Sequence, residues 1–185
     1  MDGSADNYSR YLAGDDSAFI EIIREYKDGL ILFLNGFTHD LSTAEDLMED
    51  TFVKIVTKRP VYRPNASFKA WLYAIARNVA RDWCRKQKYT TVGLDELTAD
   101  VKAADSLEQQ YLQDEQRLQL YSSLKKINPD YAQVLYLSYF EDFNNRQIAV
   151  VMKKSTRQVE NLLYRAKLAL KTALKKEGFV YEELS

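Results

Sequence analysis

The chain has 185 residues, enough for one domain or two small ones, and 46% of them are hydrophobic, which excludes wholesale disorder. Its single cysteine, Cys84, excludes an intrachain disulfide and a multi-cysteine zinc site, and no apolar run approaches the length of a membrane span. The formal net charge of −1 conceals sign changes, because residues up to 50 and 90–120 are mainly acidic whereas 54–89 and 153–176 are basic. The N-terminus is polar rather than signal-like, so we expect a cytoplasmic protein.

Three long helices are predicted in the first half of the chain. Apolar side chains recur at helical spacing over residues 15–36. The next helix is expected over residues 41–58, with Ser42 as its N-cap and Glu45 completing a capping box. Two prolines then interrupt the pattern, and the third helix is predicted over residues 67–88.

The second half of the chain follows a predicted acidic, flexible linker at residues 90–110, and residues 89–105 lack strong periodicity. Further helices are expected over residues 106–127, 130–141, 145–152 and 155–176. With six Gly, three Pro and no alternating strand pattern, the predicted fold class is all-α. We expect two small helical domains, at 1–89 and 111–176, followed by a tail at 177–185 that has no assigned role.

The helix predicted over residues 67–88 has two distinct faces. The apolar stripe that we expect to be buried consists of Phe68, Leu72, Ile75, Val79 and Trp83. A second ridge consists of Lys69, Tyr73, Arg77, Arg81 and Arg85. Like charges at this spacing destabilise a helix, so an anionic partner would explain the ridge, although a solvated face would also carry charge.

Rings and amides lie beside these cations. The preceding loop and the boundary between the two faces add Tyr62, Arg63, Asn65, Ser67, Trp71 and Asn78. Cations, flat rings and amides together are typical of single-stranded nucleic-acid binding. Core packing explains Trp71 equally well, and it is the preferred interpretation of Trp83.

Residues 144–176 have the pattern of a helix-turn-helix, whose second helix lies in the DNA major groove. Asn144 with Gln147, and Ser155 with Gln158, are predicted to cap the two helices. The predicted buried seam of the second helix is Val159, Leu162, Leu163, Ala166 and Leu170. The side chains left toward solvent near its start are Thr156, Arg157, Gln158, Glu160, Asn161 and Tyr164. These types suit base edges, and Arg165 suits a backbone phosphate.

Two long runs resemble conserved regions of one protein family. The first reads AEDLMEDTFVKIVTKRPVYRPNASFKAWLYAIARNVARDWCRKQ and resembles the second conserved region of bacterial sigma factors. The second reads LKKINPDYAQVLYLSYFEDFNNRQIAVVMKKSTRQVENLLYRAKLALKTAL and resembles their fourth region. Because both occur in the family's order across a linker, the chain resembles an extracytoplasmic-function (group 4) sigma factor of bacterial RNA polymerase.

The resemblance implies an alternative sigma factor that binds core RNA polymerase and directs promoter-specific transcription initiation. It implies that melted −10 DNA, with a flipped base beside Asn78, contacts Tyr62, Arg63, Asn65, Ser67, Trp71, Tyr73, Arg77, Asn78, Arg81 and Arg85. It implies that the −35 duplex contacts Ser155, Thr156, Arg157, Gln158, Glu160, Asn161, Tyr164 and Arg165. The residues implied to dock on the polymerase clamp helices are Asp46, Leu47, Glu49, Asp50 and Val53. An anti-sigma factor is a further expected partner, and no cofactor, metal or membrane insertion is implied.

Simpler interpretations exist for parts of this pattern. Without the resemblance, an ordinary acidic helix face would explain the clamp-docking residues, and a surface amide would explain Asn78. A stand-alone helix-turn-helix regulator is the alternative class, but duplex binding does not need rings on the middle helix. An enzyme is not expected, because the sequence has no Gly-rich phosphate loop, metal-ligand cluster or nucleophile–base set.

Overall fold

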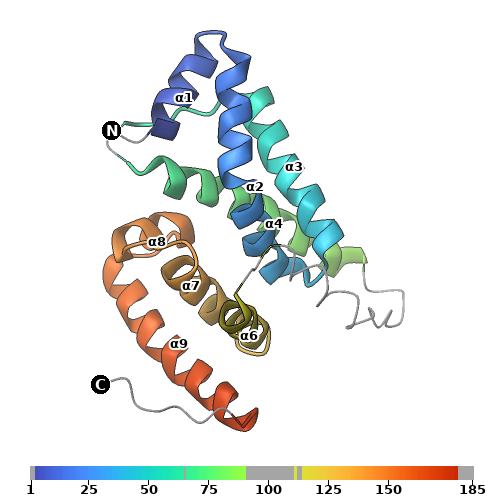
Figure 1. Cartoon of the computed structure of the whole chain (residues 1–185), viewed down its shortest axis with the longest axis vertical. Helices are drawn as coiled ribbons and strands as arrows, with labels where there is room; N and C mark the ends of the chain where they lie inside the picture. Colours follow the sequence, from blue (N-terminus) through green and yellow to red (C-terminus); the bar gives the residue numbers. More distant parts are fainter. Residues whose placement is uncertain (1–2, 65, 91–110, 112–113, 179–185) are drawn as a thin grey trace.

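The computed structural model describes residues 3–64, 66–90, 111 and 114–178, and all regular elements in these ranges are helices (Figure 1). The N-terminal bundle contains α1 (Gly3–Leu12), α2 (Asp16–Thr38), α3 (Leu41–Lys58) and α4 (Phe68–Thr90). The C-terminal domain contains α6 (Glu115–Leu124), α7 (Pro129–Tyr139), α8 (Asn145–Met152) and α9 (Thr156–Lys176). The predicted all-α fold of two small helical domains is confirmed. Most of the predicted linker lies outside the described residues.

The first helix, α1, has no counterpart among the predicted elements. Its two tyrosines, Tyr8 and Tyr11, are buried against the rest of the bundle. The Tyr8 ring lies 5.1 Å from the Trp71 ring, and its hydroxyl donates to the carbonyl oxygen of Pro60 at 2.9 Å. A ten-residue helix is marginal alone, so these contacts with distant parts of the chain stabilise it.

The start of α3 differs from the prediction. Its N-cap is Asp40, and Ser42 is exposed within the first turn. The Asp40 carboxylate accepts hydrogen bonds from the backbone N–H of Thr43 at 2.7 Å and from its hydroxyl at 2.6 Å. These two bonds lower the pKa of Asp40 below its usual value. The prediction of Ser42 was wrong because an aspartate two residues earlier already caps the helix.

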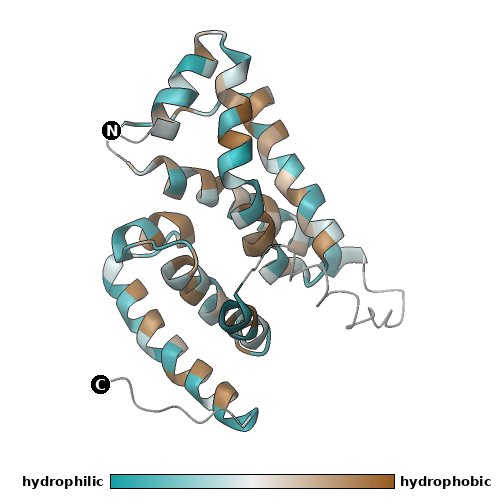
Figure 2. Cartoon of the chain, in the orientation of Figure 1, coloured by the Kyte–Doolittle hydropathy of each residue, from teal (hydrophilic) through white to brown (hydrophobic). Residues whose placement is uncertain are grey.

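Apolar residues of α2 and α4 form much of the core of the N-terminal bundle. Figure 2 shows hydrophobic and hydrophilic residues alternating along both helices. Phe33 and Leu34 of α2 and Phe68 and Leu72 of α4 are almost completely buried. The rest of the predicted α4 stripe, Ile75, Val79 and Trp83, is only half-buried. The helix also buries part of a second face, because α8 and its neighbours pack over Tyr73 and Arg77 of the ridge that we expected to face solvent, whereas Arg81 and Arg85 stay exposed.

The core of the C-terminal domain forms where α9 packs against α7 and α8. The central side chains Val134, Leu135, Ile148, Val159 and Ala166 are fully buried. The predicted seam of α9 is confirmed at Val159, Ala166 and Leu170, whereas Leu162 and Leu163 are half-buried. The solvent face of α9 therefore begins at its first turn and continues along the helix.

Replacing the observed cap tests the assignment of the α3 start. We expect Asp40→Ala to lower the free energy of unfolding by about 1 kcal/mol at neutral pH, whereas Ser42→Ala should change it much less. Because the Asp40 pKa is lowered by folding, its contribution is full above pH 3.8 and is lost as the pH falls through the lowered pKa. Urea unfolding followed by circular dichroism at several pH values measures both effects. Equal losses in the two variants would contradict the cap.

Candidate nucleic-acid interface

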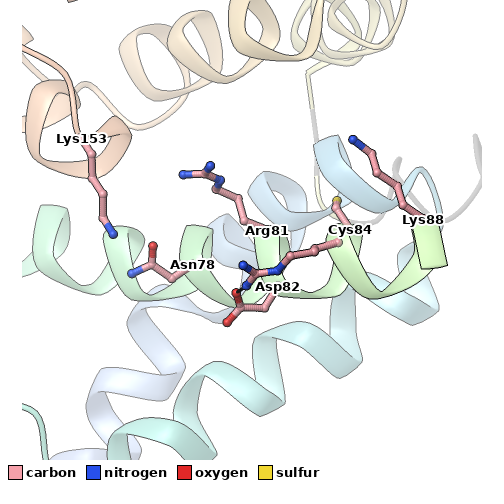
Figure 3. A pocket seen from close by; sticks show the side chains of 7 residues that line it. Asn78, Arg81, Asp82, Cys84, Lys88 and Lys153 are labelled. Carbon is pink, nitrogen blue, oxygen red and sulfur yellow. Dashed lines mark hydrogen bonds and ion pairs between the residues drawn. The ribbon is translucent and has the colours of Figure 1, made fainter. Parts of the chain in front are cut away.

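A cationic cleft runs along the C-terminal half of α4. It has a volume of about 440 Å³ and is lined by Asn78, Arg81, Asp82, Cys84, Arg85, Lys88 and Lys153. Figure 3 shows that Lys153 extends from the C-terminal domain toward Asn78 on α4. Both domains therefore contribute positive charge to this cleft, as an anionic ligand requires.

The cations of the cleft are only partly neutralised by the protein. Arg85 forms an exposed ion pair with Asp82 one turn earlier on α4. The pKa of the neighbouring Arg77 is lowered mainly by burial and then by the positive charge of Arg81. Like charges along the ridge therefore repel each other as the sequence pattern predicts, and a phosphate in the cleft would relieve that repulsion.

The loop before α4 holds its aromatic side chains against the bundle. The Tyr62 ring lies 5.3 Å from the Phe68 ring and 5.5 Å from the Trp71 ring, and its hydroxyl donates to the carbonyl oxygen of Ala66. Tyr62, Ser67 and Trp71 are half-buried. The rings thus pack on the core while part of each side chain stays accessible to solvent.

The candidate −10 residues do not all lie in one environment. Arg63, Arg81 and Arg85 are exposed and Asn78 is half-buried, so each can be approached from solvent. Asn65 lies outside the described residues.

Tyr73 and Arg77 are buried beneath the C-terminal domain in this arrangement, with exposed fractions of 1% and 6%, so their assignment as −10 contacts stays a prediction that requires the two domains to separate. An i, i+4 ridge indicates a polar face, but it cannot distinguish a face covered by solvent from one covered by another domain of the same chain.

The start of α9 has the geometry expected for a recognition helix. Ser155 and Gln158 form a capping box, in which Gln158 N–H donates to Ser155 Oγ at 3.2 Å and Ser155 N–H donates to Gln158 Oε1 at 2.8 Å. An equivalent box, Asn144 with Gln147, starts α8. Both predicted boxes are confirmed. They fix the path of the chain into each helix, and they engage the side-chain oxygens of Ser155 and Gln158 within the chain.

Beyond this cap, the first turns of α9 present polar side chains to solvent. The exposed candidates are Thr156, Arg157, Glu160, Asn161, Tyr164 and Arg165. Val159, between them, is fully buried. The turn before α9 holds Lys153 at φ 52° and ψ 48°, a left-handed conformation that is strained for a non-glycine residue. The buried seam therefore fixes which side of α9 faces a ligand.

The acidic surface predicted to dock on polymerase lies on α3. Asp46, Glu49 and Asp50 are exposed, and Val53 has 57% of its surface accessible. Leu47 is 4% exposed and packs in the bundle core, so in this arrangement a partner can reach only its exposed neighbours. Its position one helical turn from Ala44 and Thr51, both fully buried, places it on the inner side of α3.

Some residues beside these surfaces carry no signal in the sequence pattern. Glu141, in the loop after α7, forms an ion pair with Lys69 of α4, with Nζ 2.8 Å from Oε2. Gln133 of α7 accepts a hydrogen bond from Nε of Arg77 at 2.8 Å. Only the acidic character of Glu141 opposite a cationic ridge could have suggested the first contact, and nothing distinguished Gln133 from other helix-surface amides.

The fold and these surfaces define a two-domain helical DNA-binding protein, and comparisons identify its family. Residues 22–90 match the family of Sigma-70 region 2, and residues 117–170 match that of Sigma-70 region 4. The chain is 30% identical over 158 residues to RNA polymerase sigma factor YlaC of Bacillus subtilis, covering 84% of this chain and 91% of that protein. It is 29% identical to ECF RNA polymerase sigma factor SigX of Bacillus subtilis, covering 86% and 83%. This chain belongs to the extracytoplasmic-function family of RNA polymerase sigma factors.

Solved structures share the whole fold. The structure of CnrH in complex with the cytosolic domain of CnrY superposes with a TM-score of 0.70, at 20% identity, over 95% of this chain and 99% of that one. The sigma factor RpoE in complex with the anti-sigma factor NepR from Bartonella quintana gives 0.63, at 20% identity, over 85% and 96%. None of the helices in the described ranges is long and apolar enough to cross a bilayer.

Proposed function

We propose that this alternative sigma factor directs core RNA polymerase to promoters through two DNA contacts made at the same time. In this proposal, α9 reads the −35 duplex while the loop before α4 and α4 itself capture the melted −10 strand. The exposed acidic side of α3, formed by Asp46, Glu49, Asp50 and Val53, docks on the clamp helices of the polymerase. The chain supplies binding energy for strand separation and has no catalytic activity of its own.

One observation carries the proposal. The first turns of α9 expose Arg157 and Asn161 while Val159 is fully buried on the opposite side. An arginine and an amide at these places can pair with guanine and adenine edges in the major groove. A second cationic surface on α4 has no use in plain duplex binding, which disfavours a stand-alone regulator.

An anti-sigma factor and a cytoplasmic location complete the proposal. One similar solved structure is the sigma factor RpoE in complex with the anti-sigma factor NepR, and another is CnrH in complex with the cytosolic domain of CnrY. The shared fold supports a partner of the same kind for this chain. RNA polymerase acts in the bacterial cytoplasm, which supports that location.

Run-off transcription tests the function directly. Purified core polymerase, a genomic promoter library and the full chain should yield discrete transcripts whose start sites share two motifs, one for each DNA contact. Core polymerase alone is the control, and should yield none of them. Failure of the chain to associate with core polymerase, together with tight duplex binding by the chain alone, would instead support a stand-alone regulator.

Asn78 tests the −10 pocket. We expect Asn78→Ala to reduce open-complex formation by roughly tenfold, about 1.4 kcal/mol, because a hydrogen bond to the flipped base is lost. Polymerase binding should be unchanged, because Asn78 lies on α4 and not on the acidic side of α3. Permanganate footprinting reports strand opening, and a pull-down reports polymerase binding. Asn7→Ala, an amide change on α1, is the matched control, and equal loss of both activities in Asn78→Ala would rule out the pocket.

Arg157 and Asn161 test the reading of the −35 element. We expect Arg157→Ala or Asn161→Ala to relax sequence preference at one or two positions, each worth about 1–3 kcal/mol of discrimination. Competition binding of holoenzyme to a randomised −35 library measures the preference. Lys171→Ala, near the other end of α9, should leave the preferred sequence unchanged. A uniform affinity loss across all sequences would make Arg157 and Asn161 phosphate contacts instead.

A further inference from the structure

The face of α4 that carries Tyr73 and Arg77 is covered by the C-terminal domain. Figure 1 shows α4 lying between the N-terminal bundle and the C-terminal helices, and α8 packs directly against it. The Tyr73 ring lies 5.3 Å from that of Phe143, edge to face, in the segment between α7 and α8. Two of the candidate −10 residues are therefore inaccessible to a DNA strand in this arrangement.

A single carboxylate holds the centre of this contact. Glu141 pairs with Lys69 at 2.8 Å, and its backbone carbonyl also accepts a hydrogen bond from Lys69 Nζ at 2.9 Å. The Tyr136 hydroxyl lies 2.9 Å from Glu141 Oε1. Burial raises the pKa of Tyr73 well above its usual value, and the adjacent Glu141 carboxylate raises it further. Glu141 thus supplies negative charge on the face where a DNA phosphate is expected.

Other polar bonds across the same boundary also use candidate DNA contacts. Arg77 Nε donates to Gln133 Oε1 at 2.8 Å, and Gln147 Nε2 donates to the Ser67 hydroxyl at 3.1 Å. A further bond across the boundary involves no candidate DNA contact: the Tyr121 hydroxyl of α6 donates to the carbonyl oxygen of Leu32 on α2 at 2.7 Å. The two domains are therefore joined by directional hydrogen bonds that fix their relative position, and not by apolar packing alone.

The close approach at this boundary depends on a glycine. A Cβ at Gly29 of α2 would lie 2.5 Å from the Tyr73 hydroxyl and 2.7 Å from Glu141 Oε1, too close for either atom. The Tyr136 hydroxyl lies 3.0 Å from the Gly29 carbonyl oxygen. The absence of a side chain at Gly29 thus lets Glu141 and Tyr136 of the C-terminal domain approach the backbone of α2.

We propose that this contact is a self-inhibited state, in which the helix-turn-helix domain covers the −10-binding face of α4 and Glu141 is the latch that holds it there. Binding of the melted strand and closure of the two domains then exclude each other, because both require Ser67 and Arg77. Core polymerase is the partner that separates the domains. This inference rests on the proposed function, since it takes this face of α4 as the −10-binding face.

Two variants of the full chain open the latch from the C-terminal side without touching a candidate DNA contact. Glu141→Gln removes the charge that pairs with Lys69, and Gln133→Ala removes the hydrogen-bond acceptor of Arg77 with no change in net charge. We expect both to raise the radius of gyration in small-angle X-ray scattering. Affinity for a fluorescent single-stranded oligodeoxynucleotide should rise about tenfold, because apparent affinity scales with the fraction of open molecules.

The controls separate opening from charge and from folding. Glu115→Gln, on the exposed start of α6, changes net charge as Glu141→Gln does and should match the parent in both measurements. The charge swap Lys69→Glu with Glu141→Lys keeps the net charge and should restore the compact radius. Circular dichroism must show the parent's helix content in each variant, so that a larger radius reports domain separation and not unfolding.

Parent-like scattering and parent-like oligonucleotide affinity in both Glu141→Gln and Gln133→Ala would overturn the latch. An affinity gain that Glu115→Gln reproduces would do the same, because it would be a charge effect. Run-off transcription by the parent chain reports the proposed function separately. Opening without any transcription would retain the latch and reject the function, and transcription without opening would do the reverse.

Discussion

The repulsion among cations on one ridge of α4 is the constraint on which the arrangement of both domains depends. Helical spacing places Arg77, Arg81 and Arg85 at successive turns of α4, so each of these cations lies beside another one. The chain counters part of this charge with Glu141 and Asp82. The remaining positive charge lines the cleft beside Asn78, where the phosphates of a nucleic acid would neutralise it.

The two proposed DNA-binding surfaces are built differently. On α9 the polar side chains stand on one side of a helix whose start is fixed by the box of Ser155 and Gln158, so they are displayed before any ligand arrives. On α4 the cations share the helix with core residues such as Leu72 and with the interdomain contact around Tyr73. A preformed reading surface suits duplex DNA, whereas a surface that must first be uncovered suits a strand that exists only after melting.

Local rules predicted much of this structure, and long-range packing accounts for the rest. The helices, the two capping boxes and the fully buried Val159 followed from spacing and cap chemistry, which act within a few residues. The helix α1 and the burial of Tyr73 and Arg77 depend on segments far away in sequence, and no periodicity reports such contacts. Leu47 was placed on the docking surface through the family resemblance, although its apolar type and its helical position favour the core.

A closed state that inhibits must also be easy to open, and a buried, unpaired donor of Arg77 lowers the stability of the closed state. Arg77 is 6% exposed, and its Nη1 is buried with no hydrogen-bond partner among the described residues. Leaving a charged donor unpaired in a buried site costs about 1–3 kcal/mol or more, so closure stores a penalty that separation of the domains releases. In the open state the guanidinium of Arg77 can bind a phosphate, which gives its N–H donors, including those of Nη1, a hydrogen-bond acceptor. One side chain thus weakens the closed form and strengthens the DNA-bound form, so the difference in free energy between the two states is small enough for a partner to reverse it.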